Sequence, residues 1–105
     1  MSFPKHGELF WGPGKKKIRP LLVVSNDIGN RYSSNVVVIP GTTKNVESLY
    51  PVEVLAEGIK LPKTTKFQAD SIFTLSQEEL GEKIGKLSAS VMEKISQALR
   101  IELNL

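Results

Sequence analysis

The sequence predicts a mainly β protein with short helices and one α-helix at its C-terminal end. Short apolar runs rich in Val, Ile and Leu alternate with Gly/Pro turns between residues 8 and 74, which is typical of a small barrel or sandwich. Helical spacing of apolar residues is clear only after residue 90. The 105 residues are the usual size of one domain, so a single fold is expected.

Four or five short strands are expected. They cover residues 8–11, 21–24, 35–39, about 52–54 and 64–74. The run of Leu and Val after Pro20 has no polar alternation, which favours a strand buried on both faces. Pro40-Gly41 should end the third strand, and the fifth allows a break near Asp70. Residues 26–34, with Asn, Asp, Gly and Ser, are expected to be a loop.

Two capping-box patterns mark helix starts, at Ser76 with Glu79 and at Ser90 with Glu93. The first helix must be short, because glycines follow at positions 81 and 85. In the second, apolar side chains recur at helical spacing and predict a terminal helix packed on the barrel. The apolar face of this expected helix comprises Val91, Met92, Ile95, Ala98 and Leu99.

Composition narrows the function classes. The chain has no cysteine, which excludes disulfides and cysteine zinc sites, and it has no apolar run near the roughly 20 residues of a membrane span. No secretory signal precedes residue 12, so a cytoplasmic location is the default expectation. The net charge is +3, and positive charge concentrates at Lys15, Lys16, Lys17 and Arg19. This cluster suits a nucleic-acid partner, although a solvated basic surface would have the same composition.

Few residues could carry chemistry. His6 is the only histidine, which excludes acid/base catalysis by a histidine pair, and no phosphate-binding glycine loop is present. Carboxylates are spread singly apart from Glu78-Glu79, so neither a metal site nor a cofactor is expected. Polar residues do follow or precede the expected strands, at Arg19, at Thr42-Thr43, and at Gln68 and Asp70.

Barrels gather strand ends at one mouth, where these side chains could meet and bind a phosphate. Arginine presents a planar fork of donors that matches phosphate oxygens, and threonine hydroxyls can bind the same group. The alternative is that Arg19 forms a surface ion pair while the threonines cap a turn. The residues by themselves leave both interpretations open.

The order of several sequence blocks resembles the MazF/PemK toxin family. These blocks are Gly7-Glu8, Arg19 to Asp27, Val36 to Thr43, Tyr50 to Val54, Ala69-Asp70 and Lys83 to Ser88. The resemblance extends from Gly7 to Leu105 and implies that residues 1–105 form one toxin domain. It implies an SH3-like barrel with a C-terminal helix, which forms a homodimer and is neutralised by a cognate antitoxin.

The resemblance also implies a metal-independent endoribonuclease (mRNA interferase) that cuts single-stranded RNA at short sequences. The 2′-hydroxyl would attack the adjacent phosphorus and leave a cyclic phosphate and a 5′-hydroxyl. Arg19 and Thr42 match the catalytic positions. The implied substrate-binding residues are Lys15, Lys16, Lys17, Thr43, Gln68 and Asp70.

Two departures from the family pattern bear on activity. The loop before Arg19 is a short lysine-rich turn, residues 12–18, where family members have a longer segment that covers the RNA. Ser71-Ile72-Phe73 stands where many members have an arginine. Two other functions therefore stay open: a CcdB-like inhibitor of DNA gyrase, and a non-catalytic barrel that binds RNA or protein through Phe10, Trp11 and the lysine turn.

Overall fold

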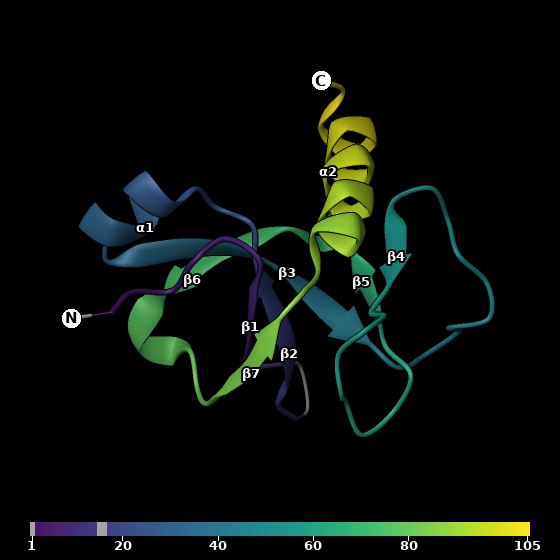
Figure 1. Cartoon of the computed structure of the whole chain (residues 1–105), viewed down its shortest axis with the longest axis horizontal. Coiled ribbons are helices and arrows are strands. Elements are labelled where there is room, and N and C mark those ends of the chain that lie inside the picture. Colours follow the sequence, from purple (N-terminus) through teal and green to yellow (C-terminus); the bar gives the residue numbers. More distant parts are fainter. Residues whose placement is uncertain (1, 15–16) are drawn as a thin grey trace.

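The computed structural model describes residues 2–14 and 17–105, in which seven strands form one curled sheet covered by a C-terminal helix (Figure 1). In chain order the elements are β1 (Glu8–Gly12), β2 (Arg19–Val23), α1 (Asp27–Tyr32), β3 (Asn35–Thr42), β4 (Glu53–Leu55), β5 (Lys66–Gln68), η1 (Ala69–Ser71), β6 (Phe73–Ser76), η2 (Gln77–Glu79), β7 (Lys83–Lys86) and α2 (Ala89–Leu103). The predicted mainly β class with a terminal helix is confirmed.

The sheet is antiparallel, in the order β4-β5-β3-β2-β1-β7, and β6 pairs with β3 outside this path. β3 is the longest strand, with eight residues, and it pairs with β2, β5 and β6. Residues 35–38 of β3 pair with β6, residues 38–40 with β2, and the last two residues with β5. This arrangement lets the sheet curl around β3, as barrel closure requires.

Alternation along the strands separates two apolar clusters. The larger lies between the sheet and α2 and includes Leu22, Ile39 and Phe67, all fully buried. The smaller lies on the opposite face and includes Leu21 and Val23 of β2. Because successive strand residues point to opposite faces, β2 contributes to both clusters. The prediction of a strand buried on both faces is confirmed.

The terminal helix α2 packs by the face that its sequence predicts. Val91, Ile95 and Ala98 are buried in the larger cluster, and Met92 and Leu99 pack against it. Its first residue, however, is not the predicted one. The Ser88 side chain accepts a hydrogen bond from the Val91 amide and caps the helix, so the capping-box prediction at Ser90 was wrong. The capping box at Ser76 and Glu79 is confirmed, and it starts the short helix η2.

Three further differences from the sequence predictions have local causes. Residues 27–32 form the helix α1 where a loop was expected, because the Asn26 side chain caps it by accepting from the Gly29 amide. Pro40-Gly41 does not end β3, since β5 pairs with Gly41 and Thr42. The expected strand 64–74 is two strands separated by η1, which is the break suggested near Asp70. β7 was not predicted at all.

Candidate functional site

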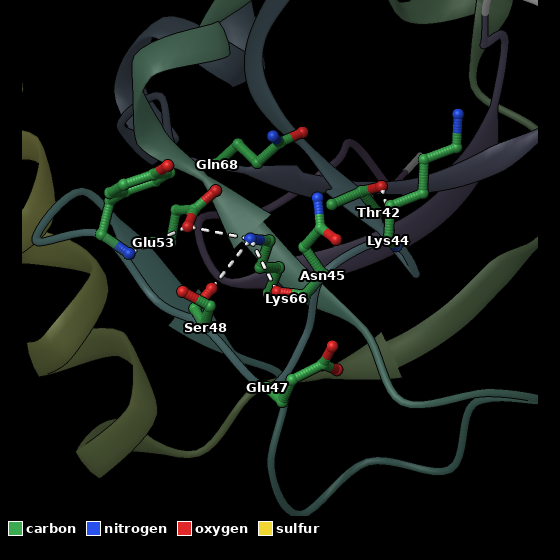
Figure 2. Close-up of a pocket in the computed structure, with 9 residues that line it drawn as sticks. Thr42, Lys44, Asn45, Glu47, Ser48, Glu53, Lys66 and Gln68 are labelled. Atoms are coloured by element: carbon green, nitrogen blue, oxygen red, sulfur yellow. Dashed lines mark hydrogen bonds and ion pairs between the residues drawn. The ribbon is translucent and has the colours of Figure 1, made fainter.

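A polar surface lies on the face of the sheet opposite α2, where the last residues of β3 meet β5 and β4. The register pairs Thr42 with Lys66, and Gln68 with Glu53. Paired residues point to the same face, so these four side chains lie together. Figure 2 shows them around one cleft.

The cleft has a volume of about 460 Å³, and every residue that lines it has a polar or charged side chain. Strand residues form one side, and the connection from β3 to β4, residues 43–52, forms the other. The lining comprises Thr42, Lys44, Asn45, Glu47, Ser48, Tyr50, Glu53, Lys66 and Gln68. An opening that offers amides, hydroxyls and both signs of charge is suited to a polar ligand with several hydrogen-bonding groups.

A buried ion pair stabilises the base of the cleft. Lys66 Nζ lies 2.9 Å from Glu53 Oε1, and each side chain is only 4% exposed. The same ammonium group donates to the backbone carbonyls of Asn45, at 3.0 Å, and Ser48, at 3.1 Å. All three donors of the lysine are thereby used, and two of them are bonded to the connection 43–52.

Glu53 remains ionised in this setting. Burial raises the pKa of Glu53, but the hydrogen bond from the Tyr50 amide and the contact with Lys66 outweigh it, so the pKa lies below its ordinary value. The carboxylate accepts the Tyr50 amide at 2.9 Å. The pair therefore consists of two charged groups at neutral pH.

Thr42 ends β3 at the rim of this cleft, and its side chain is half-buried. Its Oγ1 accepts the Lys44 amide at 3.3 Å, so the threonine does cap a turn, as one sequence interpretation held. Accepting that bond leaves the hydroxyl proton free to donate to a ligand. Turn capping and ligand binding are thus compatible at this position. Thr43 is exposed beside it.

Arg19 begins β2, opposite Gly12 of β1, and its side chain is half-buried. The β2–β3 pairing ends at Leu21 with Pro40, so Arg19 and Thr42 each lie two residues beyond its last pair, at the same end of these antiparallel strands. Arg19 is not among the residues that line the cleft. The Arg19 Nε is buried and has no hydrogen-bond partner among the described residues. The alternative interpretation, a surface ion pair, is not observed for Arg19 in the described part of the chain.

The other predicted site residues are dispersed. Gln68 lines the cleft, whereas Asp70 is exposed on η1 outside the cleft lining. Lys17 is exposed next to β2, and Lys15 and Lys16 lie outside the described residues. Sequence reasoning missed Lys66 and Glu53 altogether. Each lies within an expected strand, but alternate residues of a strand can face solvent, so the position alone does not indicate burial.

The remaining side chains of the described residues form no centre for a metal ion. Within residues 2–14 and 17–105, no three His, Asp or Glu side chains converge in a way that could hold a metal.

His6 is exposed, and its ring nitrogen lies 3.1 Å from the Val24 carbonyl. Trp11 is half-buried beside a second, shallower pocket with Pro13 and Ile18. None of the described helices is long and apolar enough to span a membrane.

Comparison with known proteins identifies relatives of this chain. It is 33% identical over 90 residues to Endoribonuclease EndoA of Bacillus subtilis (strain 168), a match covering 84% of this chain and 78% of the relative. The fold is similar to that of an endoribonuclease in complex with its cognate antitoxin from Mycobacterial species. That match has a TM-score of 0.86 and 34% identity, and covers 97% of this chain and 96% of the other.

A MazE–MazF complex from Deinococcus radiodurans has the same fold, with a TM-score of 0.82 and 23% identity over 100% of this chain and 99% of the other. The curled sheet with a terminal helix therefore matches MazF structures. The family model of the PemK-like, MazF-like toxins matches residues 7–103. The chain belongs to the family of PemK-like, MazF-like toxins of type II toxin-antitoxin systems.

Proposed function

We propose that this protein is the toxin of a type II toxin-antitoxin system and acts as a sequence-specific endoribonuclease on single-stranded RNA, with messenger RNA as its target. The observation that supports the proposal is that Arg19 and Thr42 each lie two residues beyond the last β2–β3 pair, Leu21 with Pro40, with Thr42 at the rim of a polar cleft. Relatives at 33% and 34% identity carry the name endoribonuclease. Family membership and the geometry of this rim therefore favour the same activity.

The reaction we propose is a transesterification within the RNA. The ribose 2′-oxygen loses its proton and bonds to the adjacent phosphorus, while the bond from phosphorus to the 5′-oxygen breaks and that oxygen gains a proton. The products are a 2′,3′-cyclic phosphate and a 5′-hydroxyl. Arg19 would face the crowded negative charge of the transition state, and the free Thr42 hydroxyl proton would bind the same phosphate.

Metal independence is part of the proposal. A guanidinium group keeps its charge at any physiological pH and can bind two phosphate oxygens at once. Arg19 would supply in this way the positive charge that a metal ion supplies in many nucleases.

The proposed partners follow from charge and size. A net charge of +3 favours RNA and the acidic tail of a cognate antitoxin, and a relative of known structure was solved in complex with its antitoxin. Lys15, Lys16 and Lys17 would contact the RNA backbone in place of the longer loop of other members. A homodimer would add buried surface to a chain of only 105 residues.

The test is incubation of the purified protein with a long single-stranded RNA in EDTA, beside the variant Arg19→Ala. We expect discrete fragments with 5′-hydroxyl ends and a rate at least about 100-fold lower in the variant, since one preorganised donor contributes roughly that much. Arg31→Ala, which removes an exposed arginine on α1, is the matched control and should cut normally. RNA left intact at high protein concentration would reject the proposal, and inhibition of DNA gyrase would then be tested.

A further inference from the structure

The connection 43–52 between β3 and β4 makes no strand or helix of its own, yet it supplies five of the cleft-lining residues. Its side chains are mostly exposed, and Tyr50 is 68% exposed. A segment with little apolar burial is expected to move unless something else holds it. What holds this one lies beneath it, in β5 and β4.

Lys66 makes the main bonds to this connection. Its ammonium group donates to two carbonyls of the connection, at Asn45 and Ser48, and its third bond goes to Glu53. Glu53 in turn accepts the Tyr50 amide. The pair thus holds both halves of the connection. Figure 2 shows the three bonds of the Lys66 ammonium group radiating from its nitrogen.

Stability alone is a poor reason for such a pair. Desolvating two charges offsets most of their attraction, and apolar replacements of buried ion pairs are often as stable or more so. The adjacent residue Phe67 is fully buried in an apolar cluster, so this strand can pack apolar side chains. An ion pair supplies what an apolar pair lacks, namely fixed hydrogen bonds to the backbone of a surface segment.

We propose that Lys66 and Glu53 are positioning residues that hold the connection 43–52 in one conformation and so determine which nucleobase the cleft accepts beside the scissile phosphate. The inference rests on the proposed ribonuclease function. Held in this way, the Tyr50 ring is available for stacking, and the amide groups of Asn45 and Gln68 can bind the edge of an unstacked base. Stacking together with edge hydrogen bonds is how proteins read single-stranded RNA.

The experiment uses the double variant Lys66→Met/Glu53→Gln, which removes both charges and leaves neither one buried alone. The matched control is Lys94→Met/Glu57→Gln, which makes the same changes in an ion pair whose side chains are both 62% exposed. Cleavage sites are mapped on a long RNA by sequencing the new 5′ ends. The kinetic constants kcat and KM are then measured on two short RNAs that differ in one base of the preferred site.

For the double variant we expect a broader set of cleavage sites. Discrimination between the two short RNAs should fall about tenfold, because roughly one well-formed hydrogen bond to the base is lost. The loss should appear as a higher KM for the preferred RNA with kcat changed less than about threefold, because binding is affected and the reacting groups are not. The control should keep the original site profile and both constants.

An unchanged site profile and discrimination in a folded double variant would overturn the inference while leaving the ribonuclease function intact. An inactive native protein would instead reject both. If the double variant fails to fold, Lys66→Arg replaces it, because the arginine keeps a positive charge against Glu53 while its planar group cannot bond both carbonyls in the same geometry. If Lys66→Arg discriminates between the two short RNAs as well as the native protein does, that result would also overturn the inference.

Discussion

Replacing Lys66 alone by methionine should destabilise the protein severely. The substitution keeps the length of the side chain, so little packing volume is lost. It leaves Glu53 with its side chain 4% exposed and no cation beside it, and it removes the donor to two backbone carbonyls. A buried carboxylate without its partner is one of the costliest defects that a single substitution can create.

The magnitude follows from the burial of both groups. Removing one partner of a fully buried pair costs about 3 to 5 kcal/mol in the free energy of unfolding. In a chain of this size that corresponds to a fall in Tm of roughly 15 °C or more. The exposed pair of Lys94 and Glu57 provides the contrast, because Lys94→Met should cost no more than about 0.5 kcal/mol.

The effect should depend on pH with a definite sign. The pKa of Glu53 in the folded protein lies below its ordinary value of 4.5, so the carboxylate stabilises the native protein above that pH. This contribution is lost as the pH falls through the lowered folded-state value. Without Lys66 the burial of Glu53 is offset only by the hydrogen bonds from the Tyr50 amide and Gln68, so its pKa should rise and the folded variant should take up a proton more readily. The difference in stability between the two proteins should therefore be largest near neutrality and shrink as the pH falls through the raised pKa of Glu53 in the variant towards its lowered pKa in the native protein.

The assay is urea unfolding at a series of pH values for the native protein, Lys66→Met, and the double variant Lys66→Met/Glu53→Gln. Neutralising both groups should restore more than half of the lost stability, because no buried charge then lacks a partner. A single variant that loses less than about 1 kcal/mol at pH 7 would refute the reasoning. A loss of stability of the same size at every pH in Lys66→Met would also refute it.

Four further predictions test the fold and the proposed contact of Lys17 with RNA. Gly41→Ala should lower the free energy of unfolding by about 1 to 3 kcal/mol, because the new Cβ would lie 2.7 Å from a threonine methyl. Gly29→Ala should stabilise α1 by about 0.5 to 1 kcal/mol, because its new Cβ would meet no side-chain atom closer than 3.5 Å. Thermal unfolding checks both signs. Ser88→Ala should cost about 1 kcal/mol as the cap of α2, and equal losses for Ser88→Ala and Ser90→Ala would contradict the assigned cap. Lys17→Gln should lower the salt dependence of single-stranded RNA binding by about 0.7 in the log–log slope, and an unchanged slope would mean that Lys17 does not contact phosphate.

Much of the fold was predictable because it depends on local patterns. The apolar run after Pro20 identified a strand buried on both faces, and helical spacing after residue 90 identified the buried face of α2. Helix boundaries were less accessible, because Ser88 and Ser90 both have the chemistry of a cap and only the backbone geometry distinguishes them. α1 was missed since Asn, Asp and Gly also favour loops, and here a single side-chain cap at Asn26 decides between the two.

The candidate site was predictable only in part. Thr42 and Gln68, which line the cleft, could be selected because polar residues at strand ends tend to gather at one end of a barrel. The buried pair could not, since Lys is almost never buried and a lysine in a sequence is normally assigned to the surface. Only the β4–β5 pairing brings Lys66 and Glu53, 13 residues apart, into contact. The sequence holds both residues, but their partnership depends on a register that the sequence pattern leaves undetermined.

The β3–β5 register links the core of the barrel to its site. Gly41 pairs with Phe67 on the buried face, where a side chain at position 41 would collide with the packing, and the next pair, Thr42 with Lys66, faces the cleft. A slip of one residue would exchange the two faces, burying the threonine and exposing the glycine. The close fit of Gly41 against the Phe67 ring therefore selects the one pairing that also places Thr42 above the buried lysine. Substitutions in this part of the core should alter RNA cleavage through the register of β3, without touching a residue of the cleft.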